Sequence, residues 1–300
     1  MLLTRLTEER IVKLFRQGQT LGSVYRSLGQ EATACGTALA LGPDDVIGPL
    51  IRDLGAMLVR GATPTEVFLQ YLGRATGPSG GREHNNHFGS VARGIIAPTS
   101  MLGALIPVMA GVALSFRQKG ERRVAMTWIG DGGSSTGAFY EGLNFAVVQK
   151  LPLILVGEAN GFAFSTPPER QMAGGMAQRS QGAHTVTVDG NDAAAVYTAA
   201  AEARQHCLDG QGPVFLVCET FRMKGHAEHD NQRYVDKELL AQWAAKDPLP
   251  RFEAWLAQRG WTPEPGLAAR LEAELEAAAE TALAAPWPDP ASLTEGIFAG

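Results

Sequence analysis

The sequence predicts an α/β fold, with a parallel β-sheet that has helices on both faces. Short apolar runs with strand character recur along the chain, at residues 124–129, 153–157, 185–188 and 214–219. Helical stretches separate them, such as Gly137 to Gln149 and Asp192 to Cys207, where apolar residues recur at spacings of three and four. Strands that alternate with helices in this way are typical of a parallel sheet covered by helices.

The character of the chain changes after Pro250. Ala, Glu and Leu dominate residues 265–285 without the β-branched runs of a strand, and Pro286 follows directly. Because proline cannot continue a helix, we expect a helical hairpin or arm that ends there. We therefore divide the chain into an α/β domain of residues 1–250 and a helical C-terminal tail of residues 251–300.

Composition excludes several classes of protein. The chain has 300 residues, 45% of them apolar, and a net charge of −5, so it can bury a sizeable core and has no basic footprint for nucleic acid. The longest apolar tract, residues 101–116, is short for a membrane span and contains Pro107, so we expect a buried helix. The cysteines form no Cys-x-x-Cys pair and the first residues show no signal-peptide pattern, which indicates a cytoplasmic protein.

Two polar side chains follow neighbouring strands of the predicted sheet. Gly130-Asp131-Gly132-Gly133 directly follows the first strand, residues 124–129, and Asn160 comes shortly after the second, residues 153–157. Ligands of open parallel sheets bind outside the carboxyl ends of the strands. An Asp and an Asn there can hold a divalent cation together with diphosphate oxygens, while glycines let the backbone approach a phosphate closely. The sequence therefore predicts a metal–diphosphate site around Asp131 and Asn160.

A glycine-rich turn after a strand also occurs in other phosphate-binding motifs. A dinucleotide fingerprint, G-x-G-x-x-G, would need glycine at position 135, where Ser135 stands. The phosphate-binding pattern G-x-x-x-x-G-K-[ST] does not occur in the chain. A plain glycine-rich connection between a strand and a helix, with one exposed Asp, stays open on this motif alone.

Several ordered motifs together resemble one known family. Gly130-Asp131-Gly132 followed by Asn160 looks like the thiamine diphosphate motif. Around it, the segments 29–32, 160–167, 188–192 and 222–226 resemble the α subunit of the thiamine diphosphate-dependent decarboxylase component of 2-oxoacid dehydrogenase complexes. Pyruvate, branched-chain 2-oxoacid and acetoin dehydrogenases share that subunit type. The resemblance runs from about residue 7 to about residue 260 and implies a thiamine diphosphate-binding fold.

The resemblance implies a role for each of two sets of residues. Those that match the family's Mg²⁺ ligands are Asp131, Asn160 and Phe162, the last through its backbone carbonyl. Those that match its diphosphate contacts are an arginine and the glycine turn, namely Arg52, Gly130, Gly132 and Gly133. The cofactors implied are therefore thiamine diphosphate and Mg²⁺.

The rings of the cofactor match a short segment of the chain. Ser100 corresponds to a position that offers a backbone group to the aminopyrimidine. Leu102 corresponds to a bulky apolar residue of the family that bends the cofactor. Without the resemblance, it would be interpreted as a core leucine at the start of a helix.

Arg52 is suited to a phosphate because its planar guanidinium donates two parallel hydrogen bonds. The alternative from the residues alone is a surface ion pair with Asp53. The chain departs from the family at Ile51, which lacks the hydroxyl of the family's Tyr, and at Ala159, which replaces an Asn.

His226 is the candidate for proton handling. It lies in the loop after the strand 214–219, and an imidazole can exchange a proton near neutral pH. A lone loop histidine is usually solvated or structural, but the match to the family's active-site loop favours a catalytic role. Arg222 and Asp230 bracket this loop, and we expect that they can pair to hold its shape.

The family activates the aminopyrimidine with a Glu from a separate β subunit. Glu31 belongs to a Gly-Gln-Glu-Ala segment that is not that acid in the family. The resemblance therefore implies an α₂β₂ heterotetramer with the cofactor at the α/β interface, and a lipoyl acyltransferase as acceptor of the acyl group. The implied substrate is a 2-oxo acid or acetoin; Lys224 and Glu228 are closer to what acetoin-type subunits have.

The sequence is also compatible with two other functions. A transketolase-like half-enzyme would share the Gly-Asp-Gly to Asn motif but act on sugar phosphates. A non-catalytic paralogue would fit the departures at Ile51 and Ala159, although the intact Asp131 and Asn160 speak against it.

Overall fold

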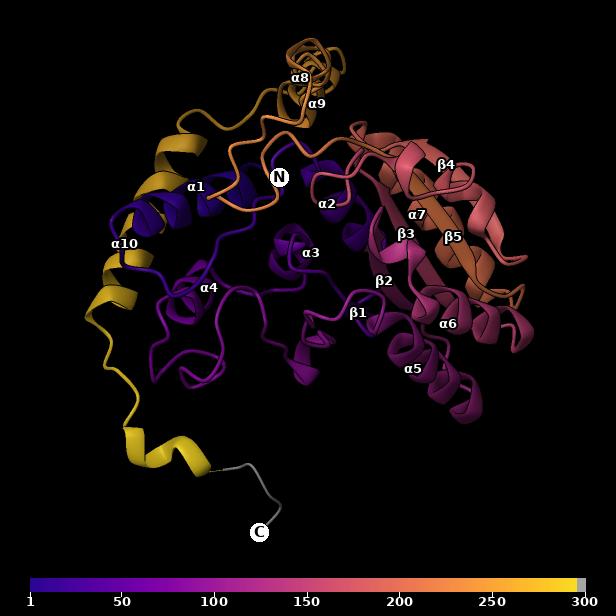
Figure 1. The fold of residues 1–300 in the computed structure, drawn as a ribbon, viewed down its shortest axis with the longest axis horizontal. Coiled ribbons are helices and arrows are strands. Elements are labelled where there is room, and N and C mark those ends of the chain that lie inside the picture. The colour runs from indigo at the N-terminus through magenta and orange to yellow at the C-terminus, as the bar shows by residue number, and fades with distance from the viewer. Residues whose placement is uncertain (296–300) are drawn as a thin grey trace.

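A computed structural model gives the fold of residues 1–295. Its sheet has five parallel strands in the order β1-β2-β3-β5-β4. The strands are β1 (Val46–Gly48), β2 (Ala125–Gly130), β3 (Leu153–Ala159), β4 (His184–Asp189) and β5 (Val214–Glu219). In Figure 1 they run side by side between two groups of helices. The predicted α/β class is therefore confirmed.

The helices fall into an N-terminal group, a group that connects the strands, and a C-terminal group. The first comprises α1 (Leu2–Arg16), α2 (Glu31–Leu39), α3 (Leu54–Val59) and α4 (Pro64–Tyr71). The second comprises α5 (Leu105–Lys119), α6 (Gly137–Val148) and α7 (Ala193–Leu208). The third comprises α8 (Lys237–Ala244), α9 (Pro248–Ala257) and α10 (Leu267–Ala284). Short 3₁₀ turns are η1 (Val91–Arg93), η2 (Gly133–Ser135), η3 (Pro168–Arg170), η4 (Met176–Arg179) and η5 (Pro290–Thr294).

The central strands are buried on both faces because their side chains alternate between two apolar layers. Met126 and Trp128 of β2 pack in one cluster with residues of α1, α2, α3 and α7. Ile129 of the same strand packs in a second cluster with Phe139 and Leu143 of α6. Helices thus cover both faces of the sheet, as Figure 1 shows.

Two elements differ from the sequence-based expectation. Strand β1 was not predicted, because three residues are too few to show a period. The apolar tract 101–116 is not one buried helix, since α5 begins only at Leu105 and Met101 and Leu102 precede it with 66% and 58% of their surface exposed. Among residues 1–295, no helix combines the length and apolar character needed to cross a bilayer.

The C-terminal helices pack back onto the N-terminal half of the chain. Leu275, Ala279 and Ala282 of α10 are buried in the same core as α1 and α4, and Arg74 lies 4.0 Å from the centre of the Trp287 ring. The division into a domain of residues 1–250 and a tail of residues 251–300 stays a prediction. Residues 296–300 of that tail lie outside the described part of the chain.

Candidate active site

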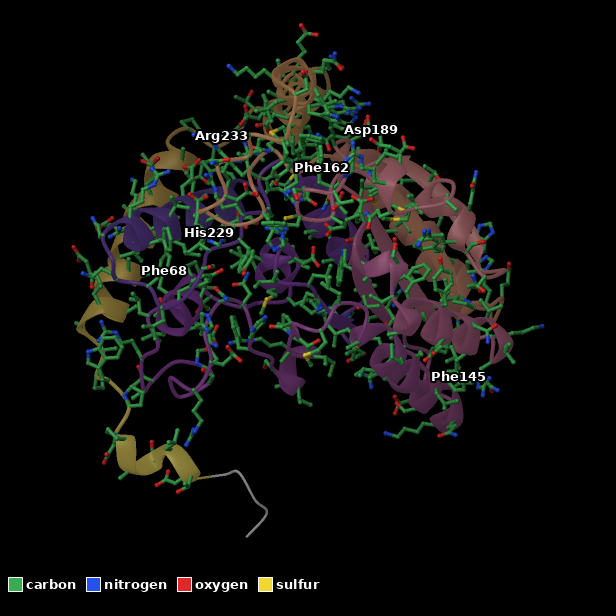
Figure 2. The ribbon with its side chains drawn as sticks, viewed as in Figure 1. Phe68, Phe145, Phe162, Asp189, His229 and Arg233 are labelled. Carbon is green, nitrogen blue, oxygen red and sulfur yellow. The ribbon has the colours of Figure 1, made fainter. Side chains whose placement is uncertain are left out.

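The ends of β2 and β3 bring the two predicted metal ligands together. Gly130 is paired with Glu158 across the two strands, so the residues that follow, Asp131 and Asn160, meet at the carboxyl edge of the sheet. Asp131 Oδ2 accepts a hydrogen bond from the Asn160 backbone amide at 3.0 Å. Phe162 and Asp189, both labelled in Figure 2, follow β3 and end β4 at this same edge.

Two glycines are required by the turns that build this edge. A side chain at Gly133 would place its Cβ 2.3 Å from Ile129 Cδ1, beneath the turn that leads into η2 and α6. Gly161 has φ +90°, a backbone conformation that side chains disfavour, and it turns the chain between Asn160 and Phe162. Within the described part of the chain, the amides of Gly132 and Gly133 donate no backbone hydrogen bond. They are therefore free to receive an anion.

Three polar groups converge at Asp131. One atom of the Asn160 side-chain amide lies 3.0 Å from Asp131 Oδ2 and 3.2 Å from the carbonyl oxygen of Phe162. With the amide nitrogen in that place it donates to both oxygens, and with the amide oxygen there, as when its nitrogen donates to Gln30, three oxygens converge. Oxygens without a proton between them repel one another, whereas a divalent cation takes carboxylate, amide and carbonyl oxygens as ligands. Burial raises the pKa of Asp131 to about 6, while backbone amides of residues 160–162 hold it down. This set of donors fits a hard cation such as Mg²⁺.

A cavity of about 440 Å³ opens above these oxygens. All the residues assigned from the sequence to the metal, the diphosphate, the rings and proton handling line it, namely Arg52, Ser100, Leu102, Gly130, Asp131, Gly132, Gly133, Asn160, Phe162 and His226. They come from five separate segments of the chain, so the fold has brought them to one place. Their individual roles stay predictions.

Leu102 lies at the mouth of the cavity and not in the core. More than half of its surface is exposed, as is that of Met101 beside it. The interpretation of Leu102 as an ordinary core leucine is therefore wrong, and a role as an apolar surface for a ligand ring remains the proposal.

Arg52 is buried, with 8% of its surface exposed, and does not pair with Asp53. Its guanidinium donates to the carbonyl oxygens of Arg26 at 3.3 Å and His226 at 2.6 Å, and it lies 3.1 Å from His226 Nδ1. Burial and the nearby Arg222 lower the pKa of Arg52 to about 10. No described carboxylate forms an ion pair with Arg52, so a buried positive charge faces the cavity and suits an anionic ligand.

His226 is enclosed by aromatic rings and cations. Phe164 and Tyr25 approach it edge-on, with ring centres 4.7 Å and 5.4 Å away. Burial, together with the charges of Arg52 and Arg222, lowers the pKa of His226 to about 4. The imidazole is therefore neutral at pH 7, and the expectation that it titrates near neutral pH does not hold in this environment. With Arg52 donating to Nδ1, the ring proton lies on Nε2.

The pKa of His226 gives a testable prediction. We expect its imidazole resonances to titrate near pH 4 in an NMR experiment, and to move toward the ordinary value of about 6.5 in Arg52→Met, which removes one of the charges that disfavour the imidazolium. The unfolded chain binds this proton more readily than the folded chain between these two pH values. His226 therefore contributes stability that is present above about pH 6.5 and is lost as the pH falls toward 4.

His206 is the control for this titration. It lies on α7, away from the cavity, where burial lowers its pKa, and this shift should persist in Arg52→Met. An unchanged pKa for His226 in that variant would contradict the electrostatic explanation.

The loop that carries His226 is held by a network of side chains. Arg222 and Asp230 do not form the direct pair that the sequence suggested. They are joined through Tyr234, whose hydroxyl accepts a hydrogen bond from Arg222 at 2.8 Å and donates one to Asp230 at 2.7 Å. Asp230 also accepts from the His226 backbone amide at 2.6 Å. Arg222 donates in addition to the Phe164 carbonyl at 2.6 Å. The network thus ties the loop after β5 to the loop after β3.

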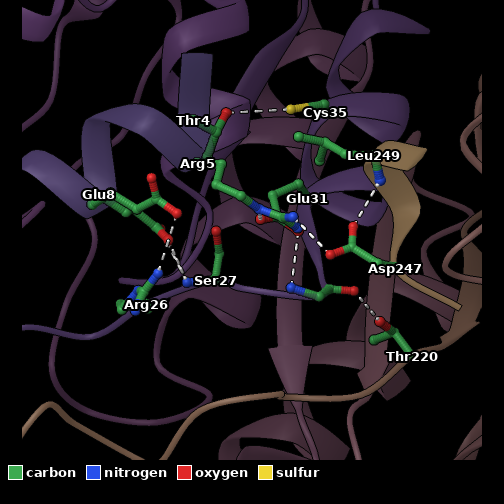
Figure 3. Close-up of polar contacts among 12 residues, drawn as sticks. Thr4, Arg5, Glu8, Arg26, Ser27, Glu31, Cys35, Thr220, Asp247 and Leu249 are labelled. Carbon is green, nitrogen blue, oxygen red and sulfur yellow. Dashed lines mark hydrogen bonds and ion pairs between the residues drawn. The ribbon is translucent and has the colours of Figure 1, made fainter. Parts of the chain in front are cut away.

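Glu31, and two histidines in one loop, His84 and His87, have structural partners. The carboxylate of Glu31 accepts from the Gly29 amide at 2.9 Å and from Arg5 at 2.7 Å, and Arg5 also pairs with Asp247 (Figure 3). Glu31 is absent from the cavity lining, as the resemblance implied. His84 and His87 both lie near Glu83, and no cluster of three or more metal-ligating His, Cys, Asp or Glu side chains occurs among residues 1–295.

Sequence reasoning missed three residues of the site. Tyr25 and Glu158 line the cavity, and Gln30 lies directly behind Asn160. Burial raises the pKa of both Glu158 and the neighbouring Asp53, that of Asp53 to about 7. A charged residue in an otherwise apolar strand was the available signal for Glu158. Tyr25 and Gln30 lie in a loop, where no periodicity marks them.

This fold and cavity define the chain as an α/β protein that binds its ligand at the carboxyl edge of a parallel sheet. The chain belongs to the dehydrogenase E1 component family, whose model matches residues 1–291. Members of this family are enzymes of the 2-oxoacid dehydrogenase type and use thiamine diphosphate.

Individual relatives agree with the family assignment. The pyruvate dehydrogenase E1 component subunit alpha of Bacillus subtilis (strain 168) is 38% identical over 270 residues, which cover 88% of this chain and 70% of the relative. The protein of the same name from Staphylococcus aureus (strain N315) is 37% identical over 290 residues, which cover 94% of this chain and 76% of the relative. The resemblance seen in the sequence motifs is thereby confirmed.

Proposed function

We propose that this chain is the α subunit of a thiamine diphosphate-dependent 2-oxoacid dehydrogenase, with pyruvate as the first substrate to test. The observation that carries the proposal is the convergence of the Asp131 carboxylate, the Asn160 side-chain amide and the Phe162 carbonyl, beside a cavity that contains a buried guanidinium without an ion-pair partner among the described carboxylates. A cation site next to an anion site is what a metal–diphosphate ligand requires.

The metal would be held by the chain's own oxygens. Asp131 contributes the one carboxylate, and Asn160 and the Phe162 carbonyl contribute neutral oxygens. With a single negative charge from the protein, a divalent cation retains positive charge for the diphosphate oxygens. The free amides of Gly132 and Gly133 and the guanidinium of Arg52 would complete the anion site.

Thiamine diphosphate, when bound, supplies a nucleophilic thiazolium carbon and an electron sink for decarboxylation of a 2-oxo acid. The protein's task is to bind, orient and manage protons. Leu102 offers an apolar surface at the cavity mouth for the rings, and Ser100 lies two residues before it. His226, neutral at pH 7, would donate a hydrogen bond from Nε2 or accept a proton at that atom.

The site needs a second chain. Burial raises the pKa of Glu158 well above its usual range, and Glu31 is paired with Arg5, so neither Glu158 nor Glu31 is a free carboxylate for the aminopyrimidine. A β subunit would supply that acid and would cover the exposed Leu102 and Met101. We therefore keep the α₂β₂ heterotetramer in the proposal, with the acyl group passed to a lipoyl acyltransferase.

The choice of substrate is part of the proposal. The two relatives above carry the name pyruvate dehydrogenase. Glu228, which suggested an acetoin-type subunit, lies within 3.7 Å of Arg16 and 3.8 Å of Arg26, so its carboxylate has a structural use. The names of the relatives therefore make pyruvate the first substrate to test, with branched-chain 2-oxo acids and acetoin as the alternatives.

Co-expression with a β subunit of the same family tests the proposal. The purified complex, with thiamine diphosphate and Mg²⁺, should reduce an electron-accepting dye when given pyruvate, and the chain alone should not. Branched-chain 2-oxo acids and acetoin serve as the alternative substrates. Dye reduction by the α chain alone would contradict the proposal. So would a cofactor-loaded complex that reduces the dye with none of the three substrates.

A further inference from the structure

Gln30 has an unusual position for a buried polar side chain. It stands at the start of α2 with 1% of its surface exposed, yet its side chain forms no cap on that helix. Instead its Oε1 accepts a hydrogen bond from Asn160 Nδ2 at 3.0 Å, across 130 residues of sequence. Among the described residues, Gln30 Nε2 has no hydrogen-bond partner. The contact with Asn160 is thus the only one that fixes this amide.

The backbone around Gln30 is held from both sides. Gly29 has φ +95°, and a Cβ there would lie 2.6 Å from the Phe221 carbonyl oxygen. The Gly29 amide donates to Glu31 at 2.9 Å and its carbonyl accepts from Thr220 at 3.1 Å. Figure 3 shows Glu31 and Thr220 on opposite sides of this segment. The Gln30 side chain therefore starts from a rigid position.

The amide of Asn160 has two possible orientations, and they differ in what they offer to a cation. In one, its nitrogen donates to Gln30 and its oxygen faces Asp131 and the Phe162 carbonyl. In the other, its nitrogen would donate to Asp131 at 3.0 Å and to Phe162 at 3.2 Å, which fills the cation site with protons. The second orientation places the amide oxygen 3.0 Å from the Gln30 side-chain amide, where it accepts a hydrogen bond only if that amide turns as well.

We propose that Gln30 is the positioning residue that keeps the oxygen of Asn160 turned toward the metal. It acts by accepting from Asn160 Nδ2, a hydrogen bond that forms only when the Asn160 oxygen faces the metal. The inference rests on the proposed function, because it requires that Asp131 and Asn160 hold a metal. It adds a residue outside the cavity that sets the affinity for that metal.

Two substitutions at Gln30 separate this role from simple packing. Gln30→Met keeps the approximate shape but removes the acceptor, so Asn160 can rotate and the metal affinity should fall by roughly 10–100-fold. Gln30→Glu keeps an accepting oxygen, whether or not the carboxyl group is protonated, so the affinity should stay within about threefold of the wild type. A residue that only fills space would show the opposite order, because a buried carboxylate costs more than a buried methionine.

A double-mutant cycle with Asn160→Asp isolates the amide orientation. A carboxylate at position 160 presents an oxygen to the cation in either rotation, so it does not need Gln30 to orient it. In the Asn160→Asp background, Gln30→Met should therefore change the metal affinity by less than about threefold. Gln30→Leu, which also lacks an acceptor, replaces Gln30→Met if the methionine variant does not assemble with the β-like partner.

The measurement is a titration of the co-purified complex with Mn²⁺ in the presence of thiamine diphosphate, with free Mn²⁺ read by electron paramagnetic resonance. Asp131→Ala is the blank. Weak binding in Gln30→Met, near wild-type binding in Gln30→Glu and a small effect in the Asn160→Asp background are expected. Equal affinities in Gln30→Met and the wild type, or a larger loss in Gln30→Glu than in Gln30→Met, would overturn the role of Gln30 alone. Wild-type binding no stronger than that of Asp131→Ala would overturn the proposed function together with it.

Discussion

Replacing Asp131 with alanine is expected to abolish metal-dependent binding of thiamine diphosphate by the assembled protein. Asp131 provides the only carboxylate among the three converging oxygens, and the neighbouring Asn160 amide already fixes its orientation at 3.0 Å. Loss of a residue that merely supports a ligand lowers metal affinity roughly 10–100-fold. We expect a loss of at least about 100-fold for the ligand itself, measured by isothermal titration calorimetry of the complex with Mg²⁺ present.

Asp189 provides the matched control for this experiment. It also follows the carboxyl end of a strand, β4, but it is exposed and pairs with Arg251 at 2.6 Å, outside the cavity. Asp189→Ala should bind the cofactor like the wild type. Equal losses in the two variants would mean that the Asp131 effect comes from damage to the sheet edge and not from the metal.

Replacing Arg52 is expected to have the second-largest effect. Arg52→Met removes the buried charge that faces the cavity, and a charge-assisted hydrogen bond contributes about 1.5–3 kcal/mol, so the affinity for thiamine diphosphate should fall roughly 10–100-fold. Arg52→Lys keeps the charge but not the planar fork, so its affinity should lie between those of Arg52→Met and the wild type. Both are measured by calorimetry of the complex, as for Asp131.

The control for Arg52 is Arg251, which pairs with Asp189 and Asp192 at the far side of the carboxyl edge. Arg251→Met should leave the cofactor affinity unchanged. If Arg52→Met also leaves it unchanged, Arg52 serves only to hold the His226 loop, through the His226 carbonyl at 2.6 Å, and the diphosphate is bound elsewhere.

The sequence predicted those parts of the fold that follow from local pattern. The apolar runs that became β2 and β3 are buried on both faces, which is why they stand out in the chain. Strand β1 has three residues, Val46–Gly48, and no pattern can be recognised over so short a length. The start of α5 was placed too early because apolar residues at the cavity mouth, including Leu102, read like the core of a helix.

The candidate site also contains residues that the sequence pattern could predict and residues that it could not. Asp131 and Asn160 could be predicted because the ends of parallel strands meet at one edge of a sheet. Gln30 and Tyr25 could not, because the packing of α2 and its preceding loop decides what they face. The environment of His226 could not be predicted either. Its low pKa arises from burial and from the charges of Arg52, which is far from it in sequence, and Arg222, which brackets its loop.

The most direct test of the cation–diphosphate site is a crystal structure of the α/β complex grown with thiamine diphosphate and Mn²⁺, with anomalous scattering used to locate the metal. We expect one manganese peak in contact with the Asp131 carboxylate, the Asn160 side-chain oxygen and the Phe162 carbonyl, with the diphosphate between it and Arg52. A metal bound without Asp131, or a cofactor bound outside the cavity that Asp131 and His226 line, would contradict the account.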